Sequence, residues 1–203
     1  FPVGITALIV SLQPILTCLL AGPLLKEKIV FRQWFGILLG FIGTAIVIGL
    51  DLGEKLQIVG FVSSVIALLG VTIGTLWQKR ISGNLSLSVN NFYQALGASI
   101  FHFSLVFTIE NAFLNFTNDF LLAMSWQIIA VSFGAFSILM YMLRVGTASK
   151  TVTLFFLVPP TTSLMSWFFL GEFLTKIDIL GLVLTTFGVY IATRENKSKL
   201  LNY

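Results

Sequence analysis

Two prolines surrounded by small polar side chains are the features of this sequence best suited to chemistry. Pro14 and Pro159 lie within long apolar segments, where we predict a pair of broken helices at matching places, because a proline removes one backbone donor and disturbs the carbonyl four residues earlier. In hydrocarbon such carbonyls are tolerated only beside protein or water. Together with nearby hydroxyl and amide groups, they could hydrogen-bond a small solute. In these two segments we predict a binding site made of Thr6, Gln13, Pro14, Thr17, Thr151, Pro159, Thr162 and Ser166.

The spacing of these polar residues supports the prediction. Thr6, Gln13 and Thr17 are at i, i+7 and i+11, which places them on one helical face. The corresponding stripe in the second segment consists of Thr151, Thr162 and Ser166. An alternative interpretation is that the prolines only kink helices for packing and that the hydroxyls bond back to their own carbonyls.

A third apolar segment, residues 90–109, adds two candidates for substrate binding. Gln94 and His102 lie two turns apart on one helical face. His102 is the only histidine, and polar groups within a membrane are costly enough to indicate function. It could take up and release a proton there, although segments outside this sequence could do so instead, and a function without proton coupling needs no such group. His102 could also simply bond a neighbouring carbonyl.

Several chemistries are disfavoured by what the sequence lacks. The single cysteine, Cys18, excludes an internal disulfide and a multi-thiolate metal site, and we predict no metal and no cofactor. His102 with Ser99 or Ser104 is the only candidate dyad, and its spacing along one helix does not favour contact, so we predict no enzyme. No lysine or arginine lies at the centre of an apolar segment, which disfavours carriers of nucleotide-sugars and phosphorylated metabolites.

Composition places the chain in a membrane. Hydrophobic residues make up 57% of 203 positions and charged residues only 10%, whereas a soluble domain has about 25% charged residues. We therefore expect an all-α polytopic membrane protein whose partners are the lipid bilayer and a small-molecule substrate, with no nucleic acid. Seven segments approach the ~20 residues that a spanning helix needs, namely 4–23, 33–50, 57–78, 90–109, 121–143, 148–170 and 177–193.

The basic residues predict the orientation of these segments. Ten of the twelve lysines and arginines fall in alternate connections, and only Lys55 and Lys176 fall in the others. Because basic loops stay in the cytoplasm, the C-terminus is predicted to be cytoplasmic and Phe1 to lie outside.

The two proline-bearing segments belong to an internal repeat with an offset of 145 positions and no gap. Five predicted spans separate equivalent points, so the second copy should point the opposite way, as in inverted-repeat transporters. We divide the chain into residues 1–50 (the last two spans of a first unit), a linker 51–56, a five-span second unit 57–195 and a cytoplasmic tail 196–203. Three further spans before Phe1 would complete a ten-helix, two-unit inverted repeat, of which seven transmembrane helices are visible here. The identical pairs are Thr6/Thr151, Leu12/Leu157, Pro14/Pro159, Thr17/Thr162, Leu19/Leu164, Leu25/Leu170, Glu27/Glu172, Gly36/Gly181, Leu39/Leu184, Gly43/Gly188 and Ile46/Ile191.

These residues carry a family resemblance. The run from Gly4 to Pro14, the Leu-Lys-Glu at 25–27 and the Gln-Trp-Phe-Gly at 33–36 resemble the end of an EamA domain of the drug/metabolite transporter superfamily. The second copy, with Phe-Leu-Val-Pro-Pro at 156–160 and Leu-Gly-Glu at 170–172, resembles another. The resemblance implies a permease or exporter of the bacterial inner membrane, with a cavity between the two repeats and alternating access. From the lack of fixed cations we expect a neutral or zwitterionic substrate such as an amino acid. A non-transporting scaffold is the alternative of another class.

Two further features are interpreted as structural. Glu27 and Glu172 lie at span ends, where we expect them to pair with basic groups or with terminal backbone. The family usually has glycine where this chain has Lys26. Two glycine pairs have a four-residue spacing that permits close helix contact, and packing within one protomer explains them as well as a homodimer does: Gly36/Gly40 and Gly70/Gly74.

Overall fold

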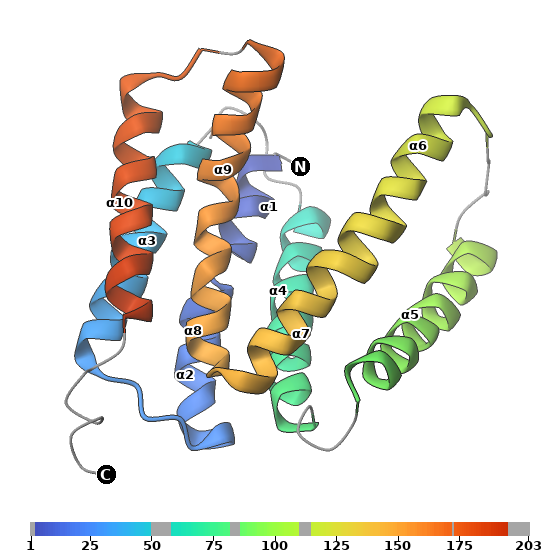
Figure 1. Cartoon of the computed structure of the whole chain (residues 1–203), viewed down its shortest axis with the longest axis horizontal. Coiled ribbons are helices and arrows are strands. Elements are labelled where there is room, and N and C mark those ends of the chain that lie inside the picture. Colours follow the sequence, from blue (N-terminus) through green and yellow to red (C-terminus); the bar gives the residue numbers. More distant parts are fainter. Residues whose placement is uncertain (1–2, 50–57, 82–85, 110–114, 172, 195–203) are drawn as a thin grey trace. The chain divides into compact units, whose positions relative to one another are not determined.

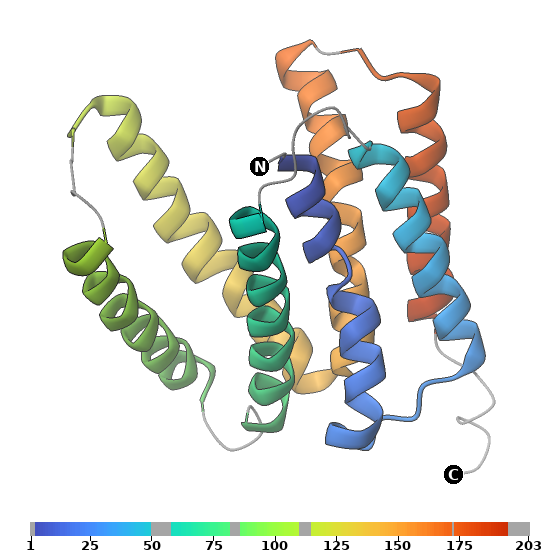
Figure 2. The same cartoon turned by 180° about the vertical axis from the view of Figure 1, so that it is seen from behind.

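In the computed structural model of the chain, residues 3–49, 58–81, 86–109, 115–171 and 173–194 are described, and these contain helices and no strand. They fall into two compact units, one of Phe1–Trp77 with Thr147–Tyr203 and one of Gln78–Gly146. Figures 1 and 2 show the helices of each unit from opposite sides. The helices are α1 (Val3–Val10), α2 (Gln13–Leu25), α3 (Phe31–Ile48), α4 (Ile58–Ile81), α5 (Leu87–Ile109), α6 (Asn118–Trp126), η1 (Gln127–Ala135), α7 (Phe136–Val145), α8 (Ala148–Thr153), η2 (Leu154–Leu157), α9 (Val158–Met165), η3 (Ser166–Leu170) and α10 (Lys176–Thr193).

Within the described residues, six helical stretches are long and apolar enough to cross a membrane. They match six of the seven predicted segments. The fourth predicted segment forms the 23-residue helix α5 but is not among the six. Asn90, Asn91, Gln94 and His102 lower its hydropathy. The six stretches are Ile5–Leu25, Phe31–Ile48, Ile58–Ile81, Asn118–Val145, Ala148–Phe169 and Lys176–Thr193.

The two copies of the repeat fold in the same way. Before Pro14 the chain breaks between α1 and α2, and Leu12 at the break has φ −74° and ψ −9°. Before Pro159 the chain narrows into the 3₁₀ turn η2, and Leu157 has φ −75° and ψ −13°. Each proline is then accommodated in the first turn of a new helix, where its missing N–H costs least. The predicted pair of broken helices is therefore confirmed.

The turn that ends each broken helix is also repeated. Lys26 is left-handed with φ 57° and ψ 30°, and its counterpart Gly171 has φ 68° and ψ 19°. Glycine adopts this conformation without strain, whereas a lysine does so at a cost. After these turns α3 and α10 begin 145 residues apart and also end 145 residues apart. The exact offset indicates that local sequence fixes the backbone of both copies.

Helices α3 and α10 pack directly on each other through four glycines. A Cβ added to Gly36 would lie 2.6 Å from the carbonyl oxygen of Gly188, and one added to Gly43 would lie 2.7 Å from that of Gly181. Residue 36 therefore faces 188 while 43 faces 181, so the helices are antiparallel. The repeat relates Gly36 to Gly181 and Gly43 to Gly188, so it exchanges the two contacting pairs. The crossing of α3 and α10 therefore has a local two-fold relation.

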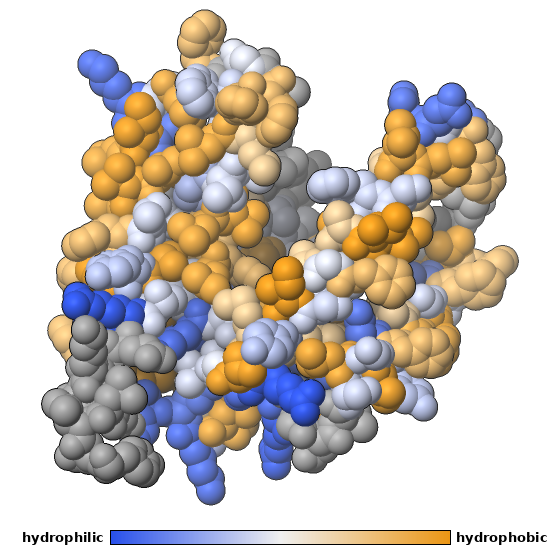
Figure 3. Space-filling view, viewed as in Figure 1, coloured by the Kyte–Doolittle hydropathy of each residue, from blue (hydrophilic) through white to orange (hydrophobic). Residues whose placement is uncertain are grey.

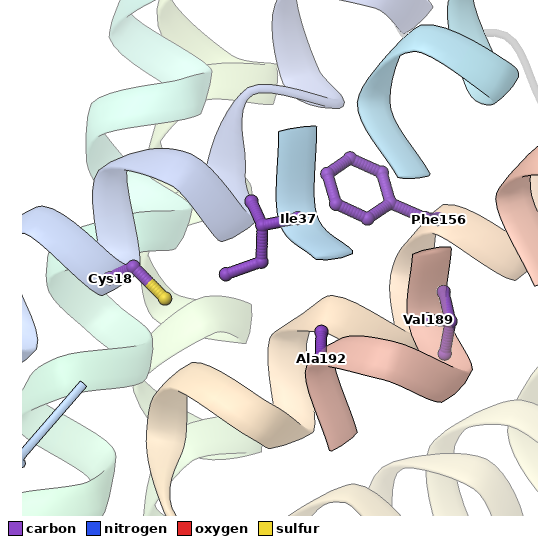
Figure 4. Close-up of a cluster of buried hydrophobic side chains, with 5 residues drawn as sticks. All are labelled: Cys18, Ile37, Phe156, Val189 and Ala192. Carbon is purple, nitrogen blue, oxygen red and sulfur yellow. The ribbon is translucent and has the colours of Figure 1, made fainter. Parts of the chain in front are cut away.

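The hydrophobic core of this unit lies where the two copies meet. Figure 4 shows its buried side chains, which come from α2, α3, η2 and α10. The ring of Phe156 is 1% exposed and lies against Gly40 of α3. By contrast, a Cβ on Gly70 or Gly74 would meet nothing within 4 Å among the described residues, so only the first glycine pair serves packing here. The cluster consists of Cys18, Ile37, Phe156, Val189 and Ala192.

The second unit has fewer internal contacts and is built on α5 and the long stretch from α6 to α7. The Asn91 amide of α5 donates a hydrogen bond to the Ser132 carbonyl at 3.5 Å. At the other end the Lys79 ammonium donates to the Gly146 carbonyl at 2.6 Å. Its outer side chains are mostly apolar and exposed, as expected for helices that face lipid. Figure 3 shows apolar side chains also covering much of the visible surface along α9 and α10.

Candidate functional site

The two helix breaks line one pocket of about 300 Å³. It contains both prolines and the residues beside them in each copy. Four pairs of lining residues are related by the 145-residue offset: Val10/Phe155, Ser11/Phe156, Gln13/Val158 and Pro14/Pro159. The pocket therefore lies between equivalent points of the repeat. Its lining residues are Ala7, Val10, Ser11, Gln13, Pro14, Phe155, Phe156, Val158 and Pro159.

The backbone at the second break replaces the hydrogen bonds that the prolines remove. The Val158 N–H donates to the Phe155 carbonyl, which would otherwise pair with the nitrogen of Pro159. The Thr44 hydroxyl donates to the Phe156 carbonyl at 3.2 Å, in place of the nitrogen of Pro160. Both carbonyls on this side of the pocket are thus satisfied by the protein itself.

The polar side chains of this pocket come from the first copy only. The Ser11 hydroxyl donates to the Ala7 carbonyl at 2.7 Å, and the Gln13 amide nitrogen donates to the Thr75 hydroxyl oxygen at 3.2 Å. The equivalent positions in the second copy are Phe156 and Val158. One wall of the pocket is therefore polar and the opposite wall is apolar.

A second pocket, of about 190 Å³, lies between the end of the second broken helix and the start of α10. Its polar lining contrasts with the equivalent place in the first copy, which is closed. There Thr17, Cys18 and Gln33, the counterparts of Thr162, Ser163 and Asp178, are at most 4% exposed. The same repeat is therefore open at one end and packed shut at the other. The second pocket is lined by Thr162, Ser163, Ser166, Phe173, Leu174 and Asp178.

The structure brings only some of the predicted binding residues together. Gln13, Pro14 and Pro159 line the larger pocket, and Thr162 and Ser166 line the smaller one. The binding roles of all these residues remain predictions.

The other predicted residues of the first unit lie elsewhere. The hydroxyl oxygens of Thr6 and Ser64 lie 3.4 Å apart, within hydrogen-bond distance. Thr151 is buried, and its hydroxyl donates to the Thr147 carbonyl at 2.9 Å. Thr17 is fully buried, and its hydroxyl has no partner among the described residues. None of these three residues lines either pocket.

Gln94 and His102 belong to the second unit. The Gln94 amide donates to the Asn90 side chain at 3.4 Å. His102 is exposed, and its Nδ1 donates to the Ala98 carbonyl at 2.8 Å, the back-bonded arrangement that was the alternative for this residue. Gln94 and His102 therefore make these hydrogen bonds within helix α5 itself.

The apolar wall of the larger pocket was not predicted. Phe155, Phe156 and Val158 were passed over because apolar side chains in a membrane segment resemble those that face lipid. The available signal was the repeat itself, since two of them are the counterparts of Ser11 and Gln13.

Glu27 joins the two copies at the closed end. Its carboxylate accepts hydrogen bonds from the Ala148 N–H at 2.6 Å, the Ser149 N–H at 3.2 Å and the Ser149 hydroxyl at 2.7 Å. These donors begin α8, so the predicted pairing of Glu27 with terminal backbone is confirmed. Glu172 lies outside the described residues. Among those described, no group of three His, Cys, Asp or Glu side chains is placed to hold a metal ion.

Comparison with known proteins agrees with this architecture. A model of the EamA-like transporter family matches residues 1–49 and 58–194. The uncharacterized transporter YvbV of Bacillus subtilis (strain 168) is 22% identical over 199 residues, which are 98% of this chain and 65% of YvbV. The uncharacterized transporter YyaM of the same organism is 29% identical over 92% of this chain and 63% of YyaM. This chain thus spans slightly less than two thirds of the length of either relative.

Two further matches extend the comparison. An uncharacterized transporter from the sor 3' region of Acidianus ambivalens is 26% identical over 94% of this chain and 74% of its own length. A protein of known crystal structure superposes with a TM-score of 0.79 over 95% of this chain and 67% of that protein, at 16% identity, and so shares the fold. Because the family model covers nearly the whole chain, this protein belongs to the EamA-like transporter family and is an integral multi-pass membrane protein.

Proposed function

We propose that the protein is a secondary transporter of a small neutral or zwitterionic metabolite, such as an amino acid. The observation that carries this proposal is the pocket of about 300 Å³ enclosed by two equivalent broken helices. Broken helices at matching places in two repeats are where secondary transporters bind their substrates. The lining has no charged side chain, which favours a substrate without net charge over a phosphorylated one.

We further propose that the chain is part of a ten-helix protein in which two five-helix units have opposite orientations. The antiparallel crossing of α3 and α10, with its two exchanged glycine pairs, supports this arrangement. In an alternating-access cycle the two units rock about the bound substrate, so that equivalent ends of the repeat open in turn. Such a cycle requires that one end of the repeat is closed while the other is open. The burial of Thr17 and the exposure of its counterpart Thr162 support this requirement.

The distribution of basic residues supports a cytoplasmic location for the closed end, next to Lys26. We propose a bacterial inner membrane with the C-terminus in the cytoplasm. The pocket beside Thr162 then opens to the outside.

Transport is tested with the full-length natural protein reconstituted in liposomes. Accumulation of radiolabelled neutral amino acids is measured beside empty liposomes, with sugar phosphates and a nucleotide-sugar as competitors. We expect saturable uptake of at least one neutral compound, with no competition by the phosphorylated compounds. Competition by phosphorylated compounds alone would favour the other substrate class. Absence of uptake for every compound would favour a non-transporting scaffold.

A further inference from the structure

The orientation of the Gln13 side chain in the larger pocket can be deduced from its neighbour. Thr75 has a single hydroxyl proton, which it donates to the Val71 carbonyl at 2.7 Å. Towards Gln13 the Thr75 oxygen can therefore only accept, at 3.2 Å, so the group facing it must be the amide nitrogen. The carbonyl oxygen Oε1 of Gln13 consequently points away from Thr75.

This Oε1 atom is an unused hydrogen-bond acceptor in the pocket lining. The Gln13 side chain is 3% exposed, and the only hydrogen bond that it makes among the described residues is the one from its amide nitrogen to Thr75. Its Oε1 is not among the fully enclosed side-chain atoms that lack a partner, so this acceptor can be reached from the pocket. Buried polar groups in proteins are almost always paired, with the protein, with water or with a ligand. Gln13 lines the pocket, so the missing donor can be supplied by a molecule inside it.

The opposite wall requires a different chemistry from the same molecule. Val158 occupies the position equivalent to Gln13, and Phe155 and Phe156 extend the apolar surface beside it. The carbonyls of both phenylalanines already accept hydrogen bonds from Val158 and Thr44. This wall therefore offers apolar contact and little hydrogen bonding. No charged side chain lines the pocket, so the part of a substrate that lies against this lining should be uncharged, and the charged groups of a zwitterion would lie outside it.

We propose that Gln13 determines specificity by accepting a hydrogen bond from an uncharged N–H or O–H group of a mainly apolar substrate. The apolar body of that substrate lies against Phe155 and Val158. The two copies of the repeat thus form the two walls of the site, but only the wall from the first copy is polar. This difference fixes the orientation of a bound substrate. The inference rests on the proposed function only in taking this pocket as the substrate site.

The experiment measures binding to the full-length protein in lipid nanodiscs by equilibrium dialysis, with empty nanodiscs subtracted. The probes are indole, which has a neutral N–H on an apolar body, 3-methylindole, which keeps the N–H, and 1-methylindole, which lacks it. We expect the wild-type protein to bind indole and 3-methylindole about tenfold more tightly than 1-methylindole, as for one lost hydrogen bond to a buried acceptor.

Gln13→Met removes the acceptor while keeping the length of the side chain. It is expected to abolish the preference by weakening indole binding while leaving 1-methylindole within about twofold. The matched control is Gln127→Met, the same substitution at an exposed glutamine in η1, which should keep the wild-type preference. Equal binding of all three probes by the wild-type protein, or an unchanged preference in Gln13→Met, would overturn the inference.

A second variant serves if Gln13→Met does not fold. Thr75→Val removes the acceptor that holds the Gln13 amide and should reduce the preference by roughly threefold. An unchanged preference in Thr75→Val would also overturn the inference. Failure of the proposed function is distinguishable, because it would appear as absent transport in liposomes whatever the probes show in nanodiscs.

Discussion

The two copies of the repeat share a backbone but not an environment. Both break at a leucine before the proline, and both end in a left-handed residue. Yet Thr17 and Cys18 are at most 1% exposed, whereas Thr162 is exposed and Ser163 lines an open pocket. Local sequence therefore sets the shape of each broken helix, while the neighbouring helices decide whether that end is open.

Contacts across the closed end explain the asymmetry. Helix α2 packs against α8, and Glu27 binds the first N–H groups of α8. A rocking motion that separates α2 from α8 would break these bonds and expose the surface around Thr17. Substitutions at equivalent positions of the two copies test this explanation.

The largest effect is expected where the two copies touch through glycine. In Gly188→Ala the new Cβ would lie 2.7 Å from the Gly36 carbonyl oxygen and close to the backbone of Gly40, neither of which can move aside as a flexible side chain would. We expect a loss of about 1–3 kcal/mol or more in stability, seen as a lower unfolding temperature in detergent.

Gly74→Ala is the control for this substitution, because no atom of the described residues lies within 4 Å of its added Cβ. It should leave the unfolding temperature unchanged or slightly higher, since alanine favours helix. Equal unfolding temperatures for Gly188→Ala and the wild type would contradict the close crossing of α3 and α10.

Glu27→Gln tests the link between the copies. The substitution keeps the shape of the side chain but replaces one carboxylate oxygen by an amide NH₂ group. This group cannot accept a hydrogen bond from the Ala148 or Ser149 N–H, which in the wild type donate to the carboxylate. We expect a loss of about 1–3 kcal/mol, because a backbone or hydroxyl donor loses its acceptor. Asp119→Asn, at an exposed position in the first turn of α6, should change the unfolding temperature much less. Similar effects of the two substitutions would show that the Glu27 contacts add little.

Substitution of the equivalent threonines compares the two environments directly. Thr17→Val removes a buried hydroxyl that has no partner within the described part of the chain, so we expect unchanged or higher stability, by up to about 1 kcal/mol. The exposed Thr162 hydroxyl bonds back to the Val158 and Pro159 carbonyls, and Thr162→Val should have little effect on stability. Thermal unfolding of both variants measures this. Strong destabilisation by Thr17→Val would reveal a partner for its hydroxyl.

The smallest effect concerns the left-handed turns. Lys26 has a positive φ that glycine adopts freely, and its counterpart is Gly171. Lys26→Gly should therefore relieve strain, with a gain of at most about 1 kcal/mol, partly offset by the freer unfolded chain. Gly171→Ala should have the opposite sign. A clear loss of stability in Lys26→Gly would indicate that the lysine side chain makes a contact worth more than the strain.

The two helix breaks could be predicted from the sequence, but the side chains that lie on one face before and after each break could not. Pro14 and Pro159 end one helix and begin another for local reasons, because proline fixes its own φ and lacks an N–H. The face predicted from Thr6 and Thr17 assumed a continuous helix, yet α1 ends at Val10 and α2 begins at Gln13. Across that break the helical period no longer relates one side chain to the other.

Tertiary context decided the remaining differences. Gly36/Gly40 and Gly70/Gly74 have the same spacing, but only the first pair lies against another helix in the described residues. The apolar wall at Phe155 and Val158 could not be told from lipid-facing surface by composition. Glu27 was predictable because a carboxylate at the end of a span needs donors, and helix N-termini supply them.

The most direct test of alternately opening ends uses Cys18, the only cysteine of this chain, and its counterpart Ser163. In the full-length protein, with any cysteine outside this chain replaced, the native Cys18 is compared with Ser163→Cys in a Cys18→Ser background. Labelling by a membrane-impermeant maleimide is followed in intact cells, before and after addition of a transported substrate. We expect fast labelling of Ser163→Cys, slower when substrate is added, and negligible labelling of Cys18. Equal labelling at the two positions, or labelling of Ser163→Cys only after permeabilisation, would contradict it.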